Sequence, residues 1–304
     1  MVRKILNWSE KQTEIQLLPL AAVNGARVLA KVRVADALEI ANSGITSEEY
    51  SYALKAHFDF LICDKNDMPL FAVEFDGPTH GAPRQIRNDL LKDSLCRKLG
   101  LPVLRANWNH LTKRYRRTTP LSWLVETWFL SRAFDDAQEA GHVPFEEGFD
   151  PSSIVMTPED RNRPSPFPFD LAVEARAEMK ALHKAGKIAD PAASWHVGRD
   201  NQEALHGFAC VRINEDSGVK VTSGMRAQLL SRDLLPLLLG DILVCELLEH
   251  LRAVLSESGR AEPLTTMYQQ ARYHMKRYWP VASFAYGGNP CLATWEQRSA
   301  ARMG

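Results

Sequence analysis

The sequence predicts an α/β domain over residues 1–140 and a mostly helical accessory domain over residues 171–304. The α/β prediction rests on residues 57–107, where the apolar pattern reads strand, turn, strand, loop, helix, strand. The helical prediction rests on the Leu-rich stretch 226–256. Prolines and glycines gather in residues 141–170, and each proline biases its predecessor away from helix, so this stretch is expected to be a linker or arm.

Composition places the chain among soluble globular proteins, with 45% apolar and 24% charged residues. The 37 basic and 37 acidic side chains give a formal net charge of zero, which argues against a histone-like binder but allows a local basic face. Five cysteines without a C-x-x-C pair favour reduced thiols over a disulfide framework. Polar residues interrupt any early apolar run, and the longest apolar run, 234–239, is too short to span a bilayer. We therefore expect a cytoplasmic protein without membrane association.

Local patterns predict the elements before the central segment. Residues 8–23 predict a helix with Ser9 as its N-cap. Residues 28–38 alternate between polar and apolar and predict the first strand. Residues 47–55 predict a short helix that leads the chain into the central segment.

The central segment predicts a hairpin, a helix and a third strand. Residues 58–63 and 70–75 are apolar strands joined by the turn sequence Asp-Lys-Asn-Asp. Residues 88–99 place leucines on one face of a helix, and residues 101–105 predict the third strand. A further helix over 122–140 is expected to pack on this sheet.

Three carboxylates fall where the apolar pattern of the hairpin should not tolerate them. Asp59 lies in the first strand, and Glu74 and Asp76 end the second. Positions two apart on a strand share a face, and the hairpin can bring Asp59 opposite that pair. Clustered carboxylates repel one another and lose hydration, and Mg²⁺, which prefers oxygen ligands, relieves both costs. Ion pairs with nearby cations such as Lys92 are the structural alternative.

These residues and the segments after them resemble the restriction-endonuclease-like nucleases of the PD-(D/E)XK superfamily. More narrowly, they are similar to the branch with the very-short-patch repair endonucleases and related uncharacterised bacterial domains. That branch has an acid on one strand, a Glu-x-Asp-Gly-x-x-His segment on the next, an Asp/Lys-bearing helix and a strand ending in Leu-Arg. The matching positions are Asp59, the segment from Glu74 to His80, Asp89 with Lys92, and Leu104 with Arg105. The resemblance covers roughly residues 10–110 and implies a central mixed sheet flanked by helices.

The resemblance implies a Mg²⁺-dependent nuclease in which Mn²⁺ can substitute. It implies metal binding by Asp59, Glu74 and Asp76. The superfamily's usual lysine lies two residues after the acid, where this chain has Asp76, so Lys92 on the following helix is expected to take that role. Lys92 would stabilise negative charge in the transition state. Alternatively, Lys92 pairs with Asp89 on the same helix face.

Two further residues receive roles from the resemblance. His80 would assist proton transfer, or would hydrogen-bond a carboxylate instead. Glu14 is expected to be an additional metal ligand, direct or through water, because related domains carry a Thr-Glu segment on their first helix. A solvated helix carboxylate is the alternative for Glu14.

Basic residues cluster directly after the central segment, at Lys113, Arg114, Arg116 and Arg117, with Tyr115 among them. Their functional interpretation is contact with a phosphate backbone, with Tyr115 stacking on a base. An ordinary solvated basic turn explains the same residues equally well.

The accessory region carries less functional information. Three elements are predicted besides the Leu-rich stretch: a helix at 171–186 and a strand pair at 203–213 and 219–221. Pro236 and Gly240 are expected to break the Leu-rich stretch into two helices, which form a buried core in preference to a partner surface.

The residues and the resemblance together favour Mg²⁺-dependent hydrolysis of phosphodiester bonds, of DNA in preference to RNA, and the resemblance implies a 5′-phosphate product. A nuclease-like binding or scaffold subunit with a decayed metal site is the main alternative, and an RNA endonuclease is another. The accessory region is expected to recognise substrate, form a homodimer or dock on a partner protein.

Overall fold

The computed structural model of the 304-residue chain describes residues 4–77, 83–153 and 170–286. The chain divides into two compact units. The first consists of Met1–Phe169 and the short segment Gln228–Arg232, and the second consists of Asp170–Ala227 and Asp233–Gly304. Within the described ranges, no helix combines the length and apolarity needed to cross a membrane.

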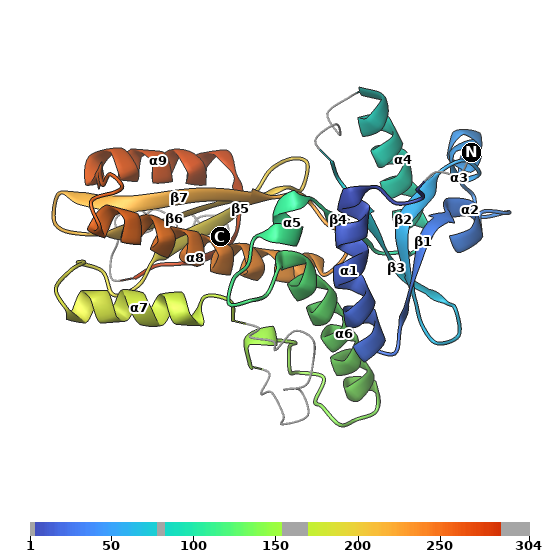
Figure 1. The fold of residues 1–304 in the computed structure, drawn as a ribbon, viewed down its shortest axis with the longest axis horizontal. Helices are drawn as coiled ribbons and strands as arrows, with labels where there is room; N and C mark the ends of the chain where they lie inside the picture. Colours follow the sequence, from blue (N-terminus) through green and yellow to red (C-terminus); the bar gives the residue numbers. More distant parts are fainter. Residues whose placement is uncertain (1–3, 78–82, 154–169, 287–304) are drawn as a thin grey trace, which may run out of the picture. The chain divides into compact units, whose positions relative to one another are not determined.

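The first unit contains a four-stranded mixed sheet with helices around it (Figure 1). Its elements are α1 (Trp8–Val23), β1 (Arg27–Arg33), α2 (Val34–Ala37), α3 (Ser47–Ala53), β2 (His57–Cys63), β3 (Pro69–Phe75), α4 (Pro83–Lys98), β4 (Val103–Ala106), α5 (Trp108–Thr112), α6 (Pro120–Glu139) and a 3₁₀ turn (Pro151–Ser153). The strand order is β1-β2-β3-β4, with antiparallel pairs except for the parallel pair β3–β4. The sheet and its flanking helices confirm the α/β class.

The two faces of this sheet are covered by different helices. On one face, Leu95 and Cys96 of α4 pack in a buried cluster with Ala72 and Val103. On the other face, Phe71 meets Trp128 of α6 edge-on, with ring centroids 4.7 Å apart. The helix α1 lies beside α6 (Figure 1). Because side chains alternate along a strand, the face that carries Ala72 also carries Glu74 two residues later.

Local sequence explains where α1 and α4 begin. The helix α1 covers the predicted range, but its N-cap is Asn7 and not Ser9. The Asn7 side chain accepts a hydrogen bond from the Glu10 N–H at 2.9 Å, and Glu10 Oε2 accepts one from the Asn7 N–H at 2.8 Å, which forms a capping box. The helix α4 starts at Pro83, several residues before the predicted start, since proline is tolerated in a first helical turn.

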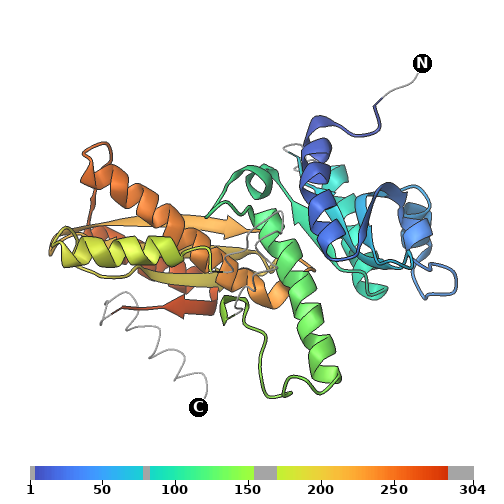
Figure 2. The ribbon, with the colours of Figure 1, turned by 60° about the horizontal axis from the view of Figure 1, so that its bottom comes forward.

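The second unit contains a five-stranded antiparallel sheet with helices on both faces (Figures 1 and 2). Its elements are α7 (Val173–Lys184), β5 (Ser194–Arg199), β6 (Leu205–Arg212), β7 (Ser217–Met225), a 3₁₀ turn (Arg232–Leu234), α8 (Leu235–Leu255), β8 (Glu262–Pro263), α9 (Leu264–Arg277) and β9 (Trp279–Phe284). The strand order is β8-β7-β6-β5-β9. Gly207 lies against Leu243 of α8, whereas the next residue, Phe208, packs with Met267 of α9, so these helices cover opposite faces.

The expectation of a mostly helical second region was wrong. The strand pair at 203–213 and 219–221 is present as β6 and β7, but three further strands join it. The flanking strands β5 and β9 contain glycine or proline and short polar residues, so their apolar alternation is weak. Strand pairing, a non-local interaction, organises them.

The Leu-rich stretch forms one helix, α8, and not the two that were predicted. Pro236 lies in its first turn, where no intrahelical N–H is required. Gly240 lies against the Trp195 ring, since a Cβ at this position would lie 3.0 Å from it. The prediction that these leucines are core is confirmed, because Leu238, Leu243 and Leu247 are fully buried.

Candidate active site

Strand register brings Asp59 and Glu74 together. Phe60 pairs with Val73 in the antiparallel β2–β3 ladder, so the preceding Asp59 falls opposite Glu74. The Asp59 N–H donates to Glu74 Oε1 at 3.3 Å, and Asp59 Oδ2 accepts a hydrogen bond from the Phe75 N–H at 2.9 Å. Two of the three predicted carboxylates are therefore neighbours at the end of the hairpin.

Lys92 approaches the pair from α4. Its ammonium lies 2.7 Å from Glu74 Oε2, donates to the His57 carbonyl at 2.9 Å and lies over the Phe58 ring. Both Lys92 and Glu74 are buried. Burial raises the pKa of Glu74, the Lys92 charge opposes that rise, and the neighbouring Asp59 charge adds to it. The carboxylate of Glu74 is thus in a place where additional positive charge would be stabilising.

A second lysine joins this group to α1. Lys31 Nζ lies 2.8 Å from Glu10 Oε1 and 2.7 Å from Asp59 Oδ1, so it bridges a helix and a strand. Burial lowers the pKa of Lys31, but the hydrogen bonds to Asp59 and Glu10 outweigh that effect and raise the pKa above its ordinary value. Lys31 has a φ of +56°, which is unusual for a residue other than glycine inside a strand. Local strain of this kind is often retained where a side chain has a functional position.

Glu10, Asp59, Glu74 and Lys92 all line one open hollow of about 560 Å³. The remaining lining residues are Asn7, Trp8, Ser9, His57, Phe75, Gly77 and Gln85. Three carboxylates and the two lysines bound to them give this group a net charge of −1, if each is ionised. The group thus joins excess negative charge to a space that is large enough for part of a ligand.

Asp76 belongs to a separate cluster around Arg105. The buried guanidinium of Arg105 reaches Asp76 at 3.3 Å, Asp89 at 3.2 Å and Asp93 at 2.6 Å. Burial lowers the pKa of Arg105, and the three carboxylates outweigh this and raise it. Asp76 is not among the residues that line the hollow. Its predicted role as a metal ligand therefore remains a prediction, and its observed partner is a structural arginine.

The other predicted site residues differ in their placement. His80 lies outside the described residues. Glu14 forms an ion pair with Lys11 on α1 and does not line the hollow, whereas Glu10, one turn earlier, does. In the sequence, Glu10 has the pattern of a residue in a first helical turn, and the capping box accounts for that pattern. Its place at the hollow could not be inferred from the pattern.

The basic turn after α5 exposes Lys113, Arg114 and Arg117. Arg114 donates to the Arg117 carbonyl at 3.1 Å, and Arg116 and Arg117 both have positive φ. Tyr115 is buried, with 6% of its surface exposed. The expectation that Tyr115 stacks on a base does not agree with this placement, because its ring is packed inside the unit. Phosphate contact by the cations around it stays a prediction.

The hollow is lined by carboxylate oxygens, the donor type that Mg²⁺ takes in proteins. Across the described residues, no group of three or more His, Cys, Asp or Glu side chains is placed so that it could hold a metal ion. Mg²⁺ commonly keeps several waters and takes only one or two carboxylates, together with substrate phosphate oxygens. Asp59 and Glu74 are two carboxylates of this kind, and one oxygen of each already accepts a hydrogen bond from a lysine.

A family model matches part of the chain. A family model described as "Protein of unknown function (DUF2726)" matches residues 2–119. No curated protein and no solved structure matches the chain. The matched residues include every residue that lines the hollow, so the candidate site lies within the matched region.

Sequence reasoning missed Glu10, Lys31 and Arg105 as members of these clusters. Arg105 was noted only as the end of a strand, and its register beside Glu74 in the parallel β3–β4 pair places it near the acids. Lys31 falls between two paired positions of the β1–β2 ladder, opposite Asp59. The available signal was a charged residue inside a predicted strand for Lys31 and at the end of one for Arg105.

Proposed function

We propose that this chain is a metal-dependent nuclease that hydrolyses phosphodiester bonds, with DNA as its favoured substrate. The observation that carries the proposal is that Asp59, Glu74 and Lys92 meet at the wall of one open hollow. They come from two strands and the following helix, the same order in which the PD-(D/E)XK resemblance places its acids and lysine. Two acidic oxygens beside an ammonium are a suitable set for phosphate chemistry.

Each side chain has a distinct part in the proposed reaction. Asp59 and Glu74 would hold Mg²⁺, and Glu10 offers a further carboxylate on the same hollow. The chemistry supplied by a bound Mg²⁺ is polarisation of a phosphate oxygen and easier ionisation of a water molecule. Lys92 would stabilise the negative charge that develops on the phosphate. Lys31 positions Glu10 and Asp59 through its two hydrogen bonds.

The test is hydrolysis by the full-length chain of supercoiled plasmid, linear duplex, single-stranded DNA and RNA. Each substrate is incubated with Mg²⁺, with Mn²⁺ or with EDTA. We expect cleavage of DNA with either metal and none with EDTA. Loss of a carboxylate in Glu74→Gln or Asp59→Asn, or of the cation in Lys92→Met, should reduce the rate by about 100-fold or more, since each acts on charge in the transition state.

Matched controls separate loss of chemistry from loss of charge or folding. Glu139→Gln and Lys55→Met remove the same charges at exposed positions outside the hollow and should leave the rate unchanged. Circular dichroism would show that each variant is folded. Equal cleavage by wild type and Glu74→Gln would contradict the proposal.

One observation favours a second candidate, a binding or scaffold subunit with a decayed metal site. Each predicted metal ligand already has a basic partner: Asp59 has Lys31, Glu74 has Lys92, Asp76 has Arg105, and Glu14 has Lys11. Tight binding of DNA without cleavage under any metal condition would support this alternative. Metal-dependent cleavage of RNA alone would support an RNA endonuclease.

The compartment and the partners of the protein are part of the same proposal. We place the activity in the cytoplasm, in keeping with free thiols at Cys63, Cys96, Cys210 and Cys245. The second unit would recognise substrate, form a homodimer or dock on a partner protein. Size-exclusion chromatography with light scattering would show whether a homodimer forms.

A further inference from the structure

Two exposed tryptophans lie together next to the hollow. Trp8 is the first residue of α1 and Trp108 is the first residue of α5, and their ring centroids are 4.9 Å apart with the ring planes tilted by 37°. Trp8 is 63% exposed and Trp108 is 43% exposed. Trp8 also lines the hollow, together with Asn7, Ser9 and Glu10 of the same helix start. An aromatic surface therefore adjoins the carboxylates.

Packing within the unit does not account for this surface. A tryptophan that serves only to hold two helices together gains most when it is buried, because the hydrophobic contribution scales with the apolar area removed from water. Here two large rings contact each other and leave much of their area in water. Trp123, by contrast, is fully buried on α6, which shows that the unit has places to bury this residue type. Exposed paired aromatics are typical of binding surfaces.

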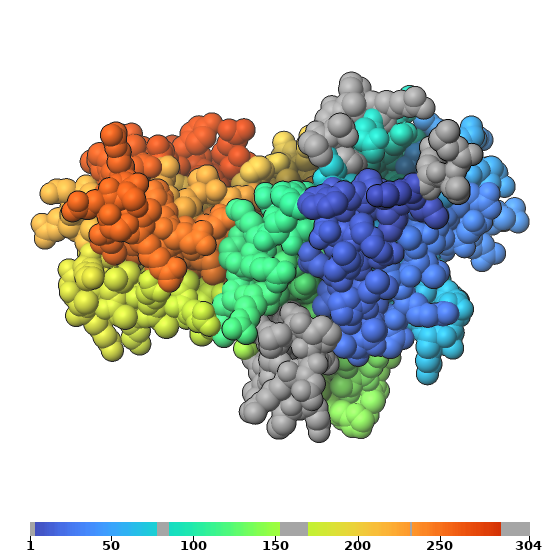
Figure 3. All heavy atoms as spheres, viewed as in Figure 1, coloured from blue at the N-terminus to red at the C-terminus, as the bar shows by residue number. Residues whose placement is uncertain are grey.

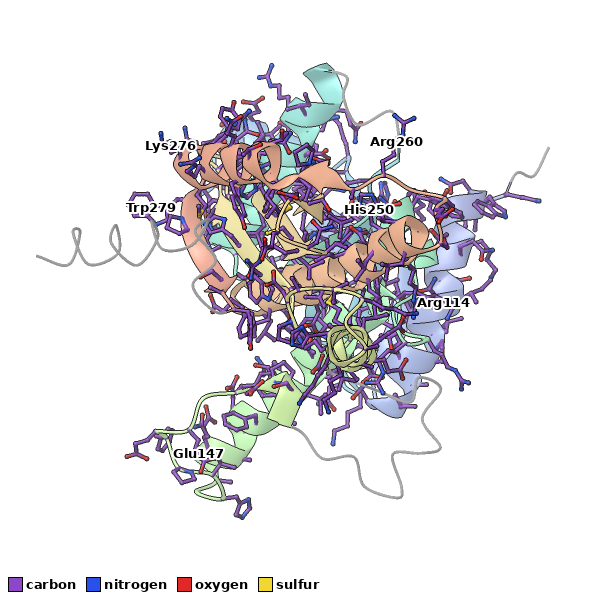
Figure 4. The ribbon with its side chains drawn as sticks, turned by 90° about the vertical axis from the view of Figure 1, so that its left-hand side faces the viewer. Arg114, Glu147, His250, Arg260, Lys276 and Trp279 are labelled. Atoms are coloured by element: carbon purple, nitrogen blue, oxygen red, sulfur yellow. The ribbon has the colours of Figure 1, made fainter. Side chains whose placement is uncertain are left out.

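Basic residues follow the tryptophan pair along the chain. The helix α5, which begins at Trp108, ends at Thr112 and leads directly into the basic turn with exposed Lys113, Arg114 and Arg117. Figure 3 shows the surfaces of α1 and of the α5 region side by side. Arg114, in the basic turn after α5, is labelled in Figure 4. The first unit therefore has three neighbouring features: the hollow with its carboxylates and Lys92, the tryptophan pair, and the basic turn. Proteins that bind single strands combine aromatic rings for the bases with cations for the backbone.

We propose that Trp8 and Trp108 form a stacking platform for an unpaired base, so that this site takes a single-stranded or locally unpaired nucleic acid strand. Bases inside a duplex are covered on both faces by their neighbours, and only an unstacked base can place a face on a tryptophan. This inference deepens the proposed nuclease function by naming its substrate class. Binding of the base does not itself require hydrolysis, so the two can be tested apart.

The experiment measures fluorescence anisotropy of labelled oligonucleotides with the full-length chain in EDTA, which removes divalent metals. The probes are about 15 nucleotides long, within the range of known single-strand sites. They are oligo-dT, oligo-rU, a duplex of the same length, and an abasic strand that has the backbone but no bases. Oligo-dT and oligo-rU distinguish a DNA from an RNA source of the unpaired base.

We expect the wild type to bind the single strand more tightly than the duplex and the abasic strand. Trp8→Ala and Trp108→Ala should each weaken single-strand binding by about 5- to 100-fold, the effect expected for loss of one stacked base. Trp8→Phe should restore part of the affinity because phenylalanine keeps an aromatic face. Added salt should weaken all forms alike, since it acts on phosphate contacts.

Trp279→Ala is the matched control. Trp279 is 63% exposed, as Trp8 is, and its ring projects outward from β9 in the second unit (Figure 4). Its loss should leave the affinity unchanged, and thermal unfolding followed by circular dichroism should show all variants folded. The inference is overturned if the wild type binds no single strand, if the abasic strand binds as well as oligo-dT, or if both alanine variants bind as the wild type does.

The outcomes separate this inference from the proposed function. Base-dependent binding that is lost in Trp8→Ala, together with no cleavage in Mg²⁺, would retain the platform and reject the nuclease. Metal-dependent cleavage with no effect of either tryptophan variant on binding would retain the nuclease and reject the platform.

Discussion

Single charged residues divide the acidic group of the first unit into two clusters. Glu74 is bound by Lys92 beside the hollow, while Asp76, only two residues later, is bound by Arg105. The two positions share a strand face, but the parallel neighbour β4 supplies a guanidinium that takes up the second carboxylate. Because of this division, the structure supports Asp59 and Glu74 as the central pair of the site.

Arg105→Met provides a test of this division. The substitution removes the positive partner of Asp76, Asp89 and Asp93 while it keeps an apolar side chain of similar length. We expect the free energy of unfolding to fall by on the order of 3–5 kcal/mol, the usual cost of leaving buried carboxylates without their cation. Urea unfolding would measure the change.

Arg87→Met is the control for this measurement. Arg87 pairs with Glu48 at an exposed position, so its loss should change the free energy of unfolding by less than about 1 kcal/mol. An equal effect of both substitutions would show that Arg105 is no more important than a surface ion pair.

At the scale of elements, close packing of β6 against α8 requires a glycine. A Cβ at Gly207 would lie 2.5 Å from Leu243 Cδ1, which is closer than side chains approach in folded proteins. Gly207→Ala should therefore destabilise the protein by about 1–3 kcal/mol, because the added methyl group overpacks the core.

A double-mutant cycle with Leu243→Ala tests this packing. Leu243→Ala alone leaves a cavity and should cost about 2–5 kcal/mol. In the double variant the new methyl group enters the space that Leu243 leaves, so the combined loss in chemical denaturation should be smaller than the sum of the two. Simple additivity would contradict direct contact.

Two buried histidines, one on β5 and one on α9, predict that the stability of the protein depends on pH. His196 and His274 meet edge-on with ring centroids 5.4 Å apart, and in the described part of the chain neither ring nitrogen of either residue has a hydrogen-bond partner. Burial lowers the pKa of His196 to about 4, and burial together with the neighbouring histidines lowers the pKa of His274 to about 3.

The sign of the effect follows from these shifts. Below the ordinary histidine pKa of about 6.5, the unfolded chain takes up protons that the folded chain refuses, so stability falls as the pH drops from about 6.5 to about 4. The loss should be on the order of 2–3 kcal/mol for each histidine. Urea unfolding across this pH range would show a weaker dependence in His274→Leu, whereas the exposed control His142→Gln should follow the wild type.

At the scale of the whole molecule, a short segment late in the sequence, Gln228–Arg232, belongs to the first unit. The Gln228 side chain accepts from the Arg105 N–H at 2.7 Å and donates to the Arg105 carbonyl at 2.9 Å, and the Leu229 N–H donates to the Val103 carbonyl at 3.2 Å. Gln228–Arg232 thus satisfies the free edge of β4, which would otherwise expose unpaired backbone groups.

A fragment that contains residues 1–169 should accordingly be less stable than the full chain. Without Gln228 and Leu229 it lacks three hydrogen bonds to β4, each worth about 0.5–1.5 kcal/mol. Thermal unfolding of the fragment, with and without an added peptide that spans residues 226–233, would measure the difference. A peptide without effect, together with a full-length Gln228→Leu variant as stable as the wild type, would contradict this account.

The sequence predicted most elements of the first unit because their signals are local. The helix over residues 8–23 and the hairpin carry periodic apolar residues and turn residues within a few positions. It predicted the second unit less well, since β5 and β9 depend on partners far along the chain. In the candidate site, the sequence predicted the acids within apolar strands. It did not predict which cation forms an ion pair with each acid.

By itself, the sequence determined the α/β character of residues 57–107, the hairpin that brings Asp59 opposite Glu74, and the leucines that form the core of α8. These features follow from the order of apolar, charged and turn residues over short stretches. Only the tertiary structure decided which cations pair with which acids: Lys92 and Lys31 bind the acids of the hollow, and Arg105 forms an ion pair with Asp76. It also decided that the rings of Trp8 and Trp108 lie in contact. The physical reason is that side-chain pairing across elements depends on strand register and helix packing, and those are set by contacts across the whole unit.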